Sequence, residues 1–186
     1  SGWRRFWAEP QKSEESEVCI YGGAVAGARK HLQVTPLLGW LEDPDFPASY
    51  RESQVRHFAA GLQVHLKNLP IMVLCGYHRG GLDPQVFKTW AEYTHKGELP
   101  FIAATADFNC TGQEVIDSGF ADVLQATVMV PNQPTCSASL LGSVIDFVLV
   151  SNSIAHLVLE IVVDHQVVCG PHSGLRIRLA TEAQAL

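Results

Sequence analysis

The chain has 186 residues, a formal net charge of −6, 47% apolar residues and 17% charged residues. This length is enough for one domain with a real core, and this composition excludes a largely disordered chain. Tight non-specific nucleic-acid binders are usually basic, so the negative charge argues against strong electrostatic affinity for DNA. It remains compatible with an acidic metal site that acts on phosphates.

The longest apolar runs, 71–75 and 144–150, have the length of strands and fall far short of the roughly 20 residues of a membrane helix. We therefore expect no membrane partner. The start of the chain, residues 1–5, has neither an initiator Met nor the apolar stretch of a signal peptide, which suggests a processed chain or a fragment. The five cysteines show no C-x-x-C spacing, which predicts reduced thiols in an intracellular compartment, nuclear or cytoplasmic.

The first half of the chain contains one clear structural signal. Residues 1–17 are polar and are expected to form a loosely ordered lead-in, 18–28 reads as a strand interrupted by glycine, and 41–51 has the composition of a surface loop. Residues 62–66 alternate between apolar and polar, and after a turn residues 71–75 are wholly apolar. This pattern predicts a hairpin that enters a buried sheet.

Helix signals appear in the middle of the chain. Asp83-Pro84 predicts a helix start, and Gly97 predicts the end of that helix. Residues 101–106 are apolar and are expected to form a short buried strand. Thr111-Gly112-Gln113-Glu114 has the spacing of a capping box, which predicts a brief helix that stops at Gly119.

Residues 144–150, 157–163 and 174–179 predict three further strands. Strands and hairpins interleaved with helices indicate an α/β fold with a mixed sheet covered by helices. We find no internal repeat and no linker, so we expect a single domain over 18–180, followed by a tail at 181–186.

Three short segments carry residues suited to phosphate chemistry. Asp107 and Asn109 follow a buried strand, and their spacing of two places both side chains on one side of an extended backbone, where they can hold a water molecule. Asp146 lies in an apolar strand, where a carboxylate is costly unless it is paired. His172 is a natural partner, because a carboxylate orients the imidazole. Alone, the segment with Asp107 and Asn109 is equally consistent with a turn or a helix cap. Asp146 alone is consistent with a cap on a neighbouring backbone group, and His172 alone with a surface or satisfied core histidine.

Taken in order, the segments form a more specific pattern. They read Ala106–Asn109 (A-D-F-N), Ile145–Ser151 (I-D-F-V-L-V-S) and Gly170–Leu175 (G-P-H-S-G-L), and an apolar strand upstream ends at Tyr77. They resemble the G-D-F-N, I-D-Y/F and S-D-H motifs of the endonuclease/exonuclease/phosphatase family, which includes abasic-site endonucleases, DNase I-like nucleases, inositol phosphatases and retroelement endonucleases. The resemblance covers residues 22–179.

The resemblance implies a fold and a set of roles. The fold would be the DNase I-like two-sheet α/β sandwich with helices on the outside, here with its first strand expected to be missing. Asp107 would activate or orient the attacking water, and Asn109 would position that water and the phosphate. Asp146 would orient His172, and His172 and Tyr77 would contact the scissile phosphate. Magnesium, or manganese in its place, would be the cofactor of an active enzyme.

The departures from the family pattern concern the metal side of the site. The Gly of G-D-F-N is Ala106, the Asp of S-D-H is Pro171, and the segment with the metal-binding Glu of the family is not found. Asp164-His165 repeats the D-H dipeptide, but the residues that follow do not fit, so we interpret it as a chance match. The sequence therefore leaves the metal ligands unknown.

Two functional hypotheses follow. In the first, the chain is a magnesium-dependent phosphodiesterase or nuclease acting on nucleic acid or another phosphodiester. In the second, it is a catalytically degenerate family member, a pseudoenzyme that binds a protein partner at an exposed sheet edge.

Overall fold

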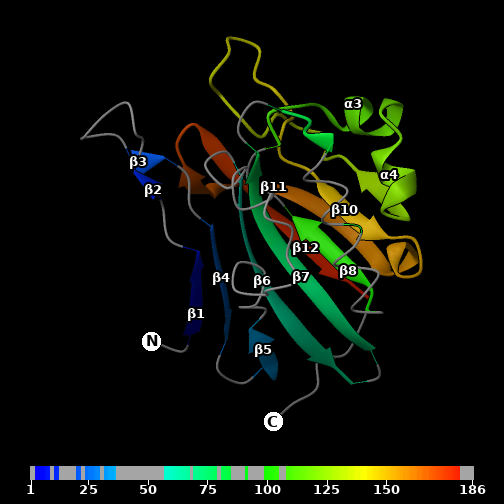
Figure 1. Ribbon diagram of the computed structural model, residues 1–186. Coiled ribbons are helices and arrows are strands. Elements are labelled where there is room, and N and C mark those ends of the chain that lie inside the picture. Colours follow the sequence, from blue (N-terminus) through cyan, green and yellow to red (C-terminus); the bar gives the residue numbers. More distant parts are fainter. Residues whose placement is uncertain are drawn as a thin grey trace.

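The protein is described from a computed structural model (Figure 1). The structure describes residues 3–8, 11–12, 20–21, 24–29, 32–36, 57–67, 69–78, 81–84, 91, 99–104 and 108–180. Among these residues, no helix has the length and apolar character needed to cross a membrane.

A six-stranded mixed sheet forms the centre of the molecule, in the order β5-β6-β7-β8-β10-β9. Strands β7 and β8 are parallel, and all other neighbours in the sheet are antiparallel. The bounds of its strands are β5 Val34–Pro36, β6 His57–Leu66, β7 Leu69–His78, β8 Phe101–Ala104, β9 Ala126–Met129 and β10 Val148–Ser151.

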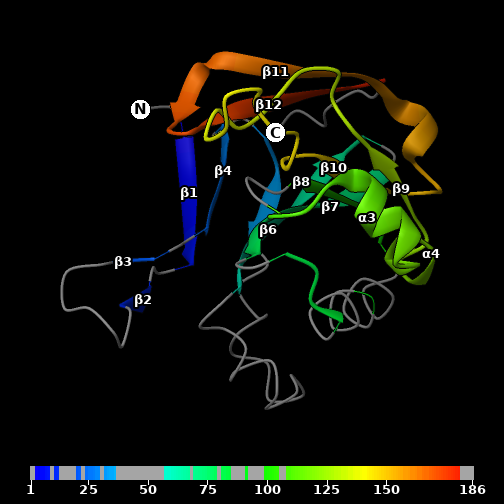
Figure 2. The ribbon, with the colours of Figure 1, turned by 90° about the horizontal axis from the view of Figure 1, so that it is seen from above.

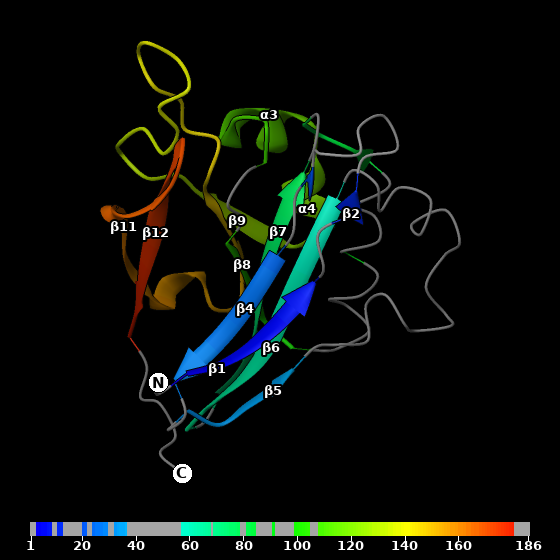
Figure 3. The same cartoon turned by 90° about the vertical axis from the view of Figure 1, so that its left-hand side faces the viewer.

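Three antiparallel strand pairs accompany this sheet. Strand β11 pairs with β12, β1 with β4, and β2 with β3. Figure 3 shows β1 and β4 beside β6, and β4 contacts both β6 and β7. The bounds are β1 Trp3–Ala8, β2 Gln11–Lys12, β3 Ile20–Tyr21, β4 Ala24–Arg29, β11 Val158–Cys169 and β12 His172–Leu179. The short helices are α3 Gly112–Asp117, α4 Phe120–Val123 and the 3-10 turn η2 Ala155–Leu157.

The two faces of the central sheet carry different cores. The helix-side core contains the alternate residues Met72, Leu74 and Leu149, packed against Val115 of α3 and the α4 region. The hairpin-side core contains the residues between them, Ile71, Ile102, Val148 and Val150, packed against apolar side chains of β11 and β12. Because successive strand side chains point to opposite faces, this alternation places the β11–β12 hairpin on one side and the helices on the other (Figure 2). The result is an α/β sandwich.

The hairpin expected around residues 62–75 is confirmed and is longer than the pattern predicted. Strands β6 and β7 pair from His57–His78 at one end to Leu66–Leu69 at the other. The capping box is also confirmed: the side chain of Thr111 accepts from the N–H of Glu114, at 3.2 Å, and the carboxylate of Glu114 accepts from the N–H of Thr111, at 2.7 Å.

Several elements differ from the sequence expectation. Strands β1 and β2 lie within residues 1–17, which were expected to be loosely ordered, and β9 was not predicted. The region 18–28 holds two strands, β3 and β4, instead of one. Pro84 and Ala91 are helical, as expected for a helix from 83 to 97, but most of that segment lies outside the described residues. The loop expected at 41–51 and the tail at 181–186 also lie outside them.

The predicted strand over residues 144–150 begins later than expected. Strand β10 starts at Val148, so Asp146 precedes the strand and does not lie inside it. The reason is a contact with another segment, because the N–H of Asp146 donates to the Thr135 side chain. His172, expected just before the last strand, is instead the first residue of β12.

Candidate active site

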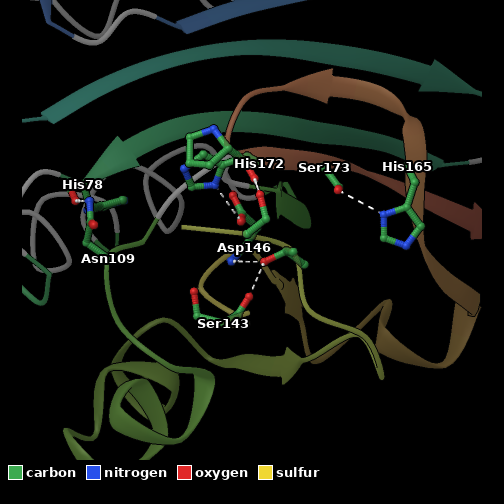
Figure 4. Close-up of polar contacts among 10 residues, drawn as sticks. His78, Asn109, Ser143, Asp146, His165, His172 and Ser173 are labelled. Atoms are coloured by element: carbon green, nitrogen blue, oxygen red, sulfur yellow. Dashed lines mark hydrogen bonds and ion pairs between the residues drawn. The ribbon is translucent and has the colours of Figure 1, made fainter. Parts of the chain in front are cut away.

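Asp146 and His172 form a side-chain pair between two elements that are distant in sequence. Atom Nδ1 of His172 lies 3.0 Å from Oδ2 of Asp146 (Figure 4). The Asp146 side chain is 1% exposed, whereas that of His172 is 18% exposed. An ionised carboxylate only accepts hydrogen bonds, so Nδ1 carries the proton in this contact. Such a contact fixes the ring of a histidine that solvent, and therefore a substrate, can still reach.

Thr135 holds the main chain of Asp146 in place. Its hydroxyl oxygen accepts from the N–H of Asp146, at 3.1 Å, and donates to the carbonyl of Ser143, at 3.4 Å. Its main-chain carbonyl accepts from the N–H of Ser173, at 2.7 Å. Thr135 is 1% exposed. One buried residue therefore contacts the main chain of Asp146 on one side and of the residue after His172 on the other.

The loop over residues 131–143 is hydrogen-bonded to the chain around His172. The main chain of Cys136 forms isolated antiparallel β-bridges with Ser143, across the loop, and with His172 on β12. The N–H and the hydroxyl of Ser137 both donate to the carbonyl of Pro171, each at 3.0 Å. The base of this loop is thereby fixed next to His172.

Asn109 lies in a segment that is hydrogen-bonded to the Asp146 segment. The N–H of Phe108 donates to the carbonyl of Ile145, at 3.0 Å. Asn109 has a φ of 49°, a left-handed conformation that asparagine tolerates better than most residues, so the extended backbone expected at this position is wrong. Its Nδ2 donates to the carbonyl of His78, at 2.8 Å (Figure 4). A Cβ on Gly81, itself at φ +88°, would lie 3.1 Å from the carbonyl oxygen of Asn109, so this close approach favours glycine.

Of the five candidate residues, three lie on segments that contact one another, the fourth lies on β7, and the fifth lies outside the described residues. Asp146 and His172 are in contact, and Asn109 is on a neighbouring segment. Tyr77 is the penultimate residue of β7, opposite Phe58 of β6, and directly precedes the His78 whose carbonyl holds Asn109. Asp107 lies outside the described residues, so its position relative to the others is not assigned.

The alternative dipeptide Asp164-His165 lies elsewhere on the β11–β12 hairpin. Asp164 is paired with Arg176 across the strands, and the N–H of Gln166 together with Arg176 holds the pKa of Asp164 below its ordinary value. His165 is exposed and contacts the hydroxyl of Ser173, at 3.1 Å, and Gln133, at 3.3 Å. These residues make contacts of their own and none with Asp146 that the described structure shows.

The chemistry of the donor groups tests the expected metal. Oδ2 of Asp146 is engaged by His172, and the residue before His172 is Pro171, which has no side-chain oxygen. Over the described ranges, no three His, Cys, Asp or Glu side chains are grouped so that they could hold an ion. Because magnesium prefers carboxylate, phosphate and water oxygens, these residues by themselves do not fit a magnesium site. We therefore assign no catalytic step to a metal.

Sequence reasoning missed two residues that organise this region. Thr135 is 11 positions before Asp146, and no local pattern connects the two. His78 follows Tyr77 directly, but a lone histidine without metal-ligand spacing has no distinguishing sequence signal. The order Tyr77-His78 was the one clue available.

Comparisons with known proteins agree on the fold. No family model and no curated protein matches the sequence. Among solved structures, the endonuclease domain of TRAS1, a telomere-specific non-LTR retrotransposon, matches with a TM-score of 0.67 and 14% identity, over 97% of this chain and 81% of that one. The 3′-5′ exonuclease NExo from Neisseria meningitidis matches with a TM-score of 0.54 and 17% identity, over 96% and 80%.

The human Nocturnin catalytic domain, in a structure with a bound sulfate anion, is a further match, with a TM-score of 0.52 and 12% identity. The match extends over 94% of this chain and 65% of the Nocturnin domain. At these identities the likeness concerns the backbone, and it agrees with the family that the sequence motifs indicate. This chain has the DNase I-like α/β fold of the endonuclease/exonuclease/phosphatase family.

Proposed function

We propose that this chain is a nuclease-like hydrolase that cleaves phosphodiester bonds in nucleic acid. The observation that carries the proposal is the buried carboxylate of Asp146 in contact with the partly exposed imidazole of His172. A buried carboxylate is costly, and a structural role would be served equally well by an apolar residue. Its pairing with a solvent-accessible histidine is the arrangement expected of a catalytic imidazole.

The structural neighbours support the same class of reaction. One is an endonuclease domain and another a 3′-5′ exonuclease. A further structure, with a TM-score of 0.51, is the 3′ phosphatase NExo bound to a product DNA hairpin. All three involve cleavage of a bond to phosphorus in nucleic acid, and this is the substrate class that we carry over to this chain.

In the proposed reaction, His172 acts on the phosphate. With Nδ1 engaged by Asp146, donation to a non-bridging phosphate oxygen comes from Nε2, and the carboxylate offsets the positive charge of the ring as the transition state forms. A water molecule oriented by Asp107 and Asn109 adds to the phosphorus and passes its proton to Asp107, while the P–O bond to the leaving oxygen breaks and that oxygen takes a proton from solvent. Tyr77 contacts the phosphate. We propose that cleavage requires magnesium or manganese. Its ligands would have to include groups other than the described residues around Asp146 and His172.

The test uses His172→Ala and Asp146→Asn on a panel of abasic duplex, intact duplex and single-stranded DNA with magnesium present. We expect each variant to lower kcat by about 10²- to 10⁴-fold. The matched control is His165→Ala, because His165 is an exposed histidine on the same hairpin that makes no described contact with Asp146. Cleavage by the wild-type chain that survives in His172→Ala would refute the assignment of the site.

One observation favours a second candidate function. Pro171 occupies the place of a carboxylate in the family motif, and proline has no side-chain oxygen that could hold a metal. A catalytically inactive family member serving as an interaction module would tolerate this loss. A folded wild-type chain that cleaves no substrate of the panel, with either magnesium or manganese, would favour this reading over hydrolysis.

A further inference from the structure

Three buried rings form a continuous column on the helix side of the sheet. The ring of His78 stacks on Phe108, with centroids 5.1 Å apart and an interplanar angle of 14°. Phe108 stacks in turn on Phe147, at 4.2 Å and 11°. The exposed fractions of His78, Phe108 and Phe147 are 1%, 0% and 0%. The column therefore joins the end of β7, the segment after β8 and the segment before β10.

Each ring contact is accompanied by a hydrogen bond between the same segments. Between the first two segments, Nδ2 of Asn109 donates to the carbonyl of His78, at 2.8 Å. Between the second and third, the N–H of Phe108 donates to the carbonyl of Ile145, at 3.0 Å. The first of these bonds is made by the candidate residue Asn109, and the second joins the residues next to Asn109 and Asp146, so a displacement of the column would be felt at both.

Every ring is next in sequence to a residue of the proposed site. His78 follows Tyr77, Phe147 follows Asp146, and Phe108 precedes Asn109. Phe147 packs in the helix-side core, whereas Asp146 reaches His172 on the β11–β12 hairpin. Because the two residues are adjacent in the chain, a shift of the main chain at Phe147 moves the carboxylate of Asp146 as well.

From this arrangement we infer that His78 is a positioning residue, and that the column His78–Phe108–Phe147 sets the placement of Asn109 and of the Asp146–His172 pair. This inference rests on the proposed function for its catalytic consequence. The role depends on a flat ring at position 78 and not on a proton. Stacked rings attract one another beyond the burial of their surface and prefer a defined geometry, and a close-packed interior transmits a displacement at one ring to the next.

The first test compares kinetics of His78→Ala, His78→Leu and His78→Phe. We expect kcat to fall by about 10- to 100-fold in the first two variants with KM nearly unchanged, since small misplacements of catalytic groups are costly. His78→Phe keeps a stacking ring and should restore kcat to about the wild-type level. The matched control is Leu124→Ala, a buried residue of the same core outside the column, which should lower stability without lowering kcat.

A second readout does not require activity. In the wild-type chain, the Nδ1 proton of His172 should give a downfield NMR resonance, because it lies in a part-buried contact with the carboxylate of Asp146. We expect this resonance to shift or broaden in folded His78→Ala and to persist in His78→Phe. A chain that cleaves nothing but shows this pattern would refute the proposed function and leave the positioning role standing.

Two results would overturn the inference. One is an unchanged kcat and an unchanged His172 resonance in folded His78→Ala. The other is a His78→Phe variant as impaired as His78→Ala, which would mean that the imidazole itself, and not a stacked ring, is needed.

Discussion

The hydroxyl oxygen of Thr135 accepts a hydrogen bond from the main-chain N–H of Asp146, at 3.1 Å, in a fully buried setting. The same hydroxyl donates to the carbonyl of Ser143. One side chain thus substitutes for a strand neighbour at the point where the chain turns into β10. The orientation of the Asp146 carboxylate toward His172 depends on this main-chain position.

Replacing Thr135 with Val should therefore affect both stability and activity. Valine keeps the shape but leaves a buried N–H of Asp146 without that acceptor, which should cost about 1–3 kcal/mol in the free energy of unfolding. We also expect kcat for DNA cleavage to fall, because the carboxylate of Asp146 would no longer be held in place toward His172. Urea denaturation and steady-state kinetics measure the two effects.

Two further variants control for this change. Thr135→Ser keeps the hydroxyl and should stay close to the wild-type kcat. Thr127→Val removes an exposed hydrogen bond, to Asn152 at 2.8 Å, and should leave both stability and kcat almost unchanged. An unaffected kcat in folded Thr135→Val would show that Asp146 does not need this anchor.

The tip of the loop over residues 131–143 carries two leucines whose side chains are almost fully exposed. Leu140 is 106% exposed and Leu141 92% exposed, while the base of the loop is fixed to Pro171 beside His172. Apolar side chains presented next to a phosphate site can insert between bases. We expect Leu140→Ser/Leu141→Ser to raise KM for duplex DNA several-fold and to change stability by no more than about 0.5 kcal/mol.

Fluorescence anisotropy with labelled duplex measures this binding effect directly. Val123→Ser is the control, because Val123 is an exposed apolar residue on α4. Equal affinities of the wild-type chain and the double variant would remove the loop tip from the substrate interface.

Metal removal should separate activity from stability. If cleavage needs magnesium or manganese, EDTA should abolish it and either ion should restore it. Pro171 removes one carboxylate of the family motif, which should weaken metal binding, so we expect the Tm of the chain to change little between EDTA and magnesium. Cleavage that persists in EDTA would contradict the metal requirement, and a large rise of Tm with magnesium would indicate a strong resident site.

The capping box of α3 makes a pH-dependent contribution to stability. The main-chain N–H of Thr111, with its hydroxyl, holds the pKa of Glu114 below its ordinary value of 4.5. A lowered folded pKa means that the contribution is fully present above the unfolded pKa and is lost as the pH falls through the folded value. Stability should therefore decline below about pH 4.5 partly because Glu114 becomes protonated.

Glu114→Gln can still accept from Thr111 but does not titrate, so it should lose stability less steeply in this range. Thermal unfolding between about pH 3 and pH 6 compares the two slopes. Parallel curves for the wild-type chain and the variant would show that this carboxylate does not contribute to the pH dependence.

Local chemistry made several elements predictable from the sequence. The alternation over residues 62–66 and the apolar run 71–75 predicted the β6–β7 hairpin, because burial on one or both faces imposes these patterns. The capping box predicted the start of α3, because its hydrogen bonds join residues three positions apart. The motifs around Asn109, Asp146 and His172 indicated the family whose fold the chain shares.

Other features have no local signal. Strand β1 lies in a stretch that was expected to be loosely ordered, and it forms by pairing with β4, from Ala8–Ala24, 16 positions apart, to Trp3–Arg29, 26 positions apart. Asp146 precedes β10 because Thr135, from another segment, accepts its N–H. Such contacts depend on chain segments meeting in the folded state, which no window of the sequence contains.

The sequence by itself determined which residue types are available for phosphate chemistry and that Asp146 and His172 belong to one motif set. Only the tertiary structure decided that their side chains lie 3.0 Å apart, that Thr135 anchors them, and that His78 stacks on the ring between Asp107 and Asn109 in the chain. The reason is physical. Motifs record local backbone and side-chain chemistry, whereas contacts across 11 to 31 positions arise when apolar burial brings strands and loops together.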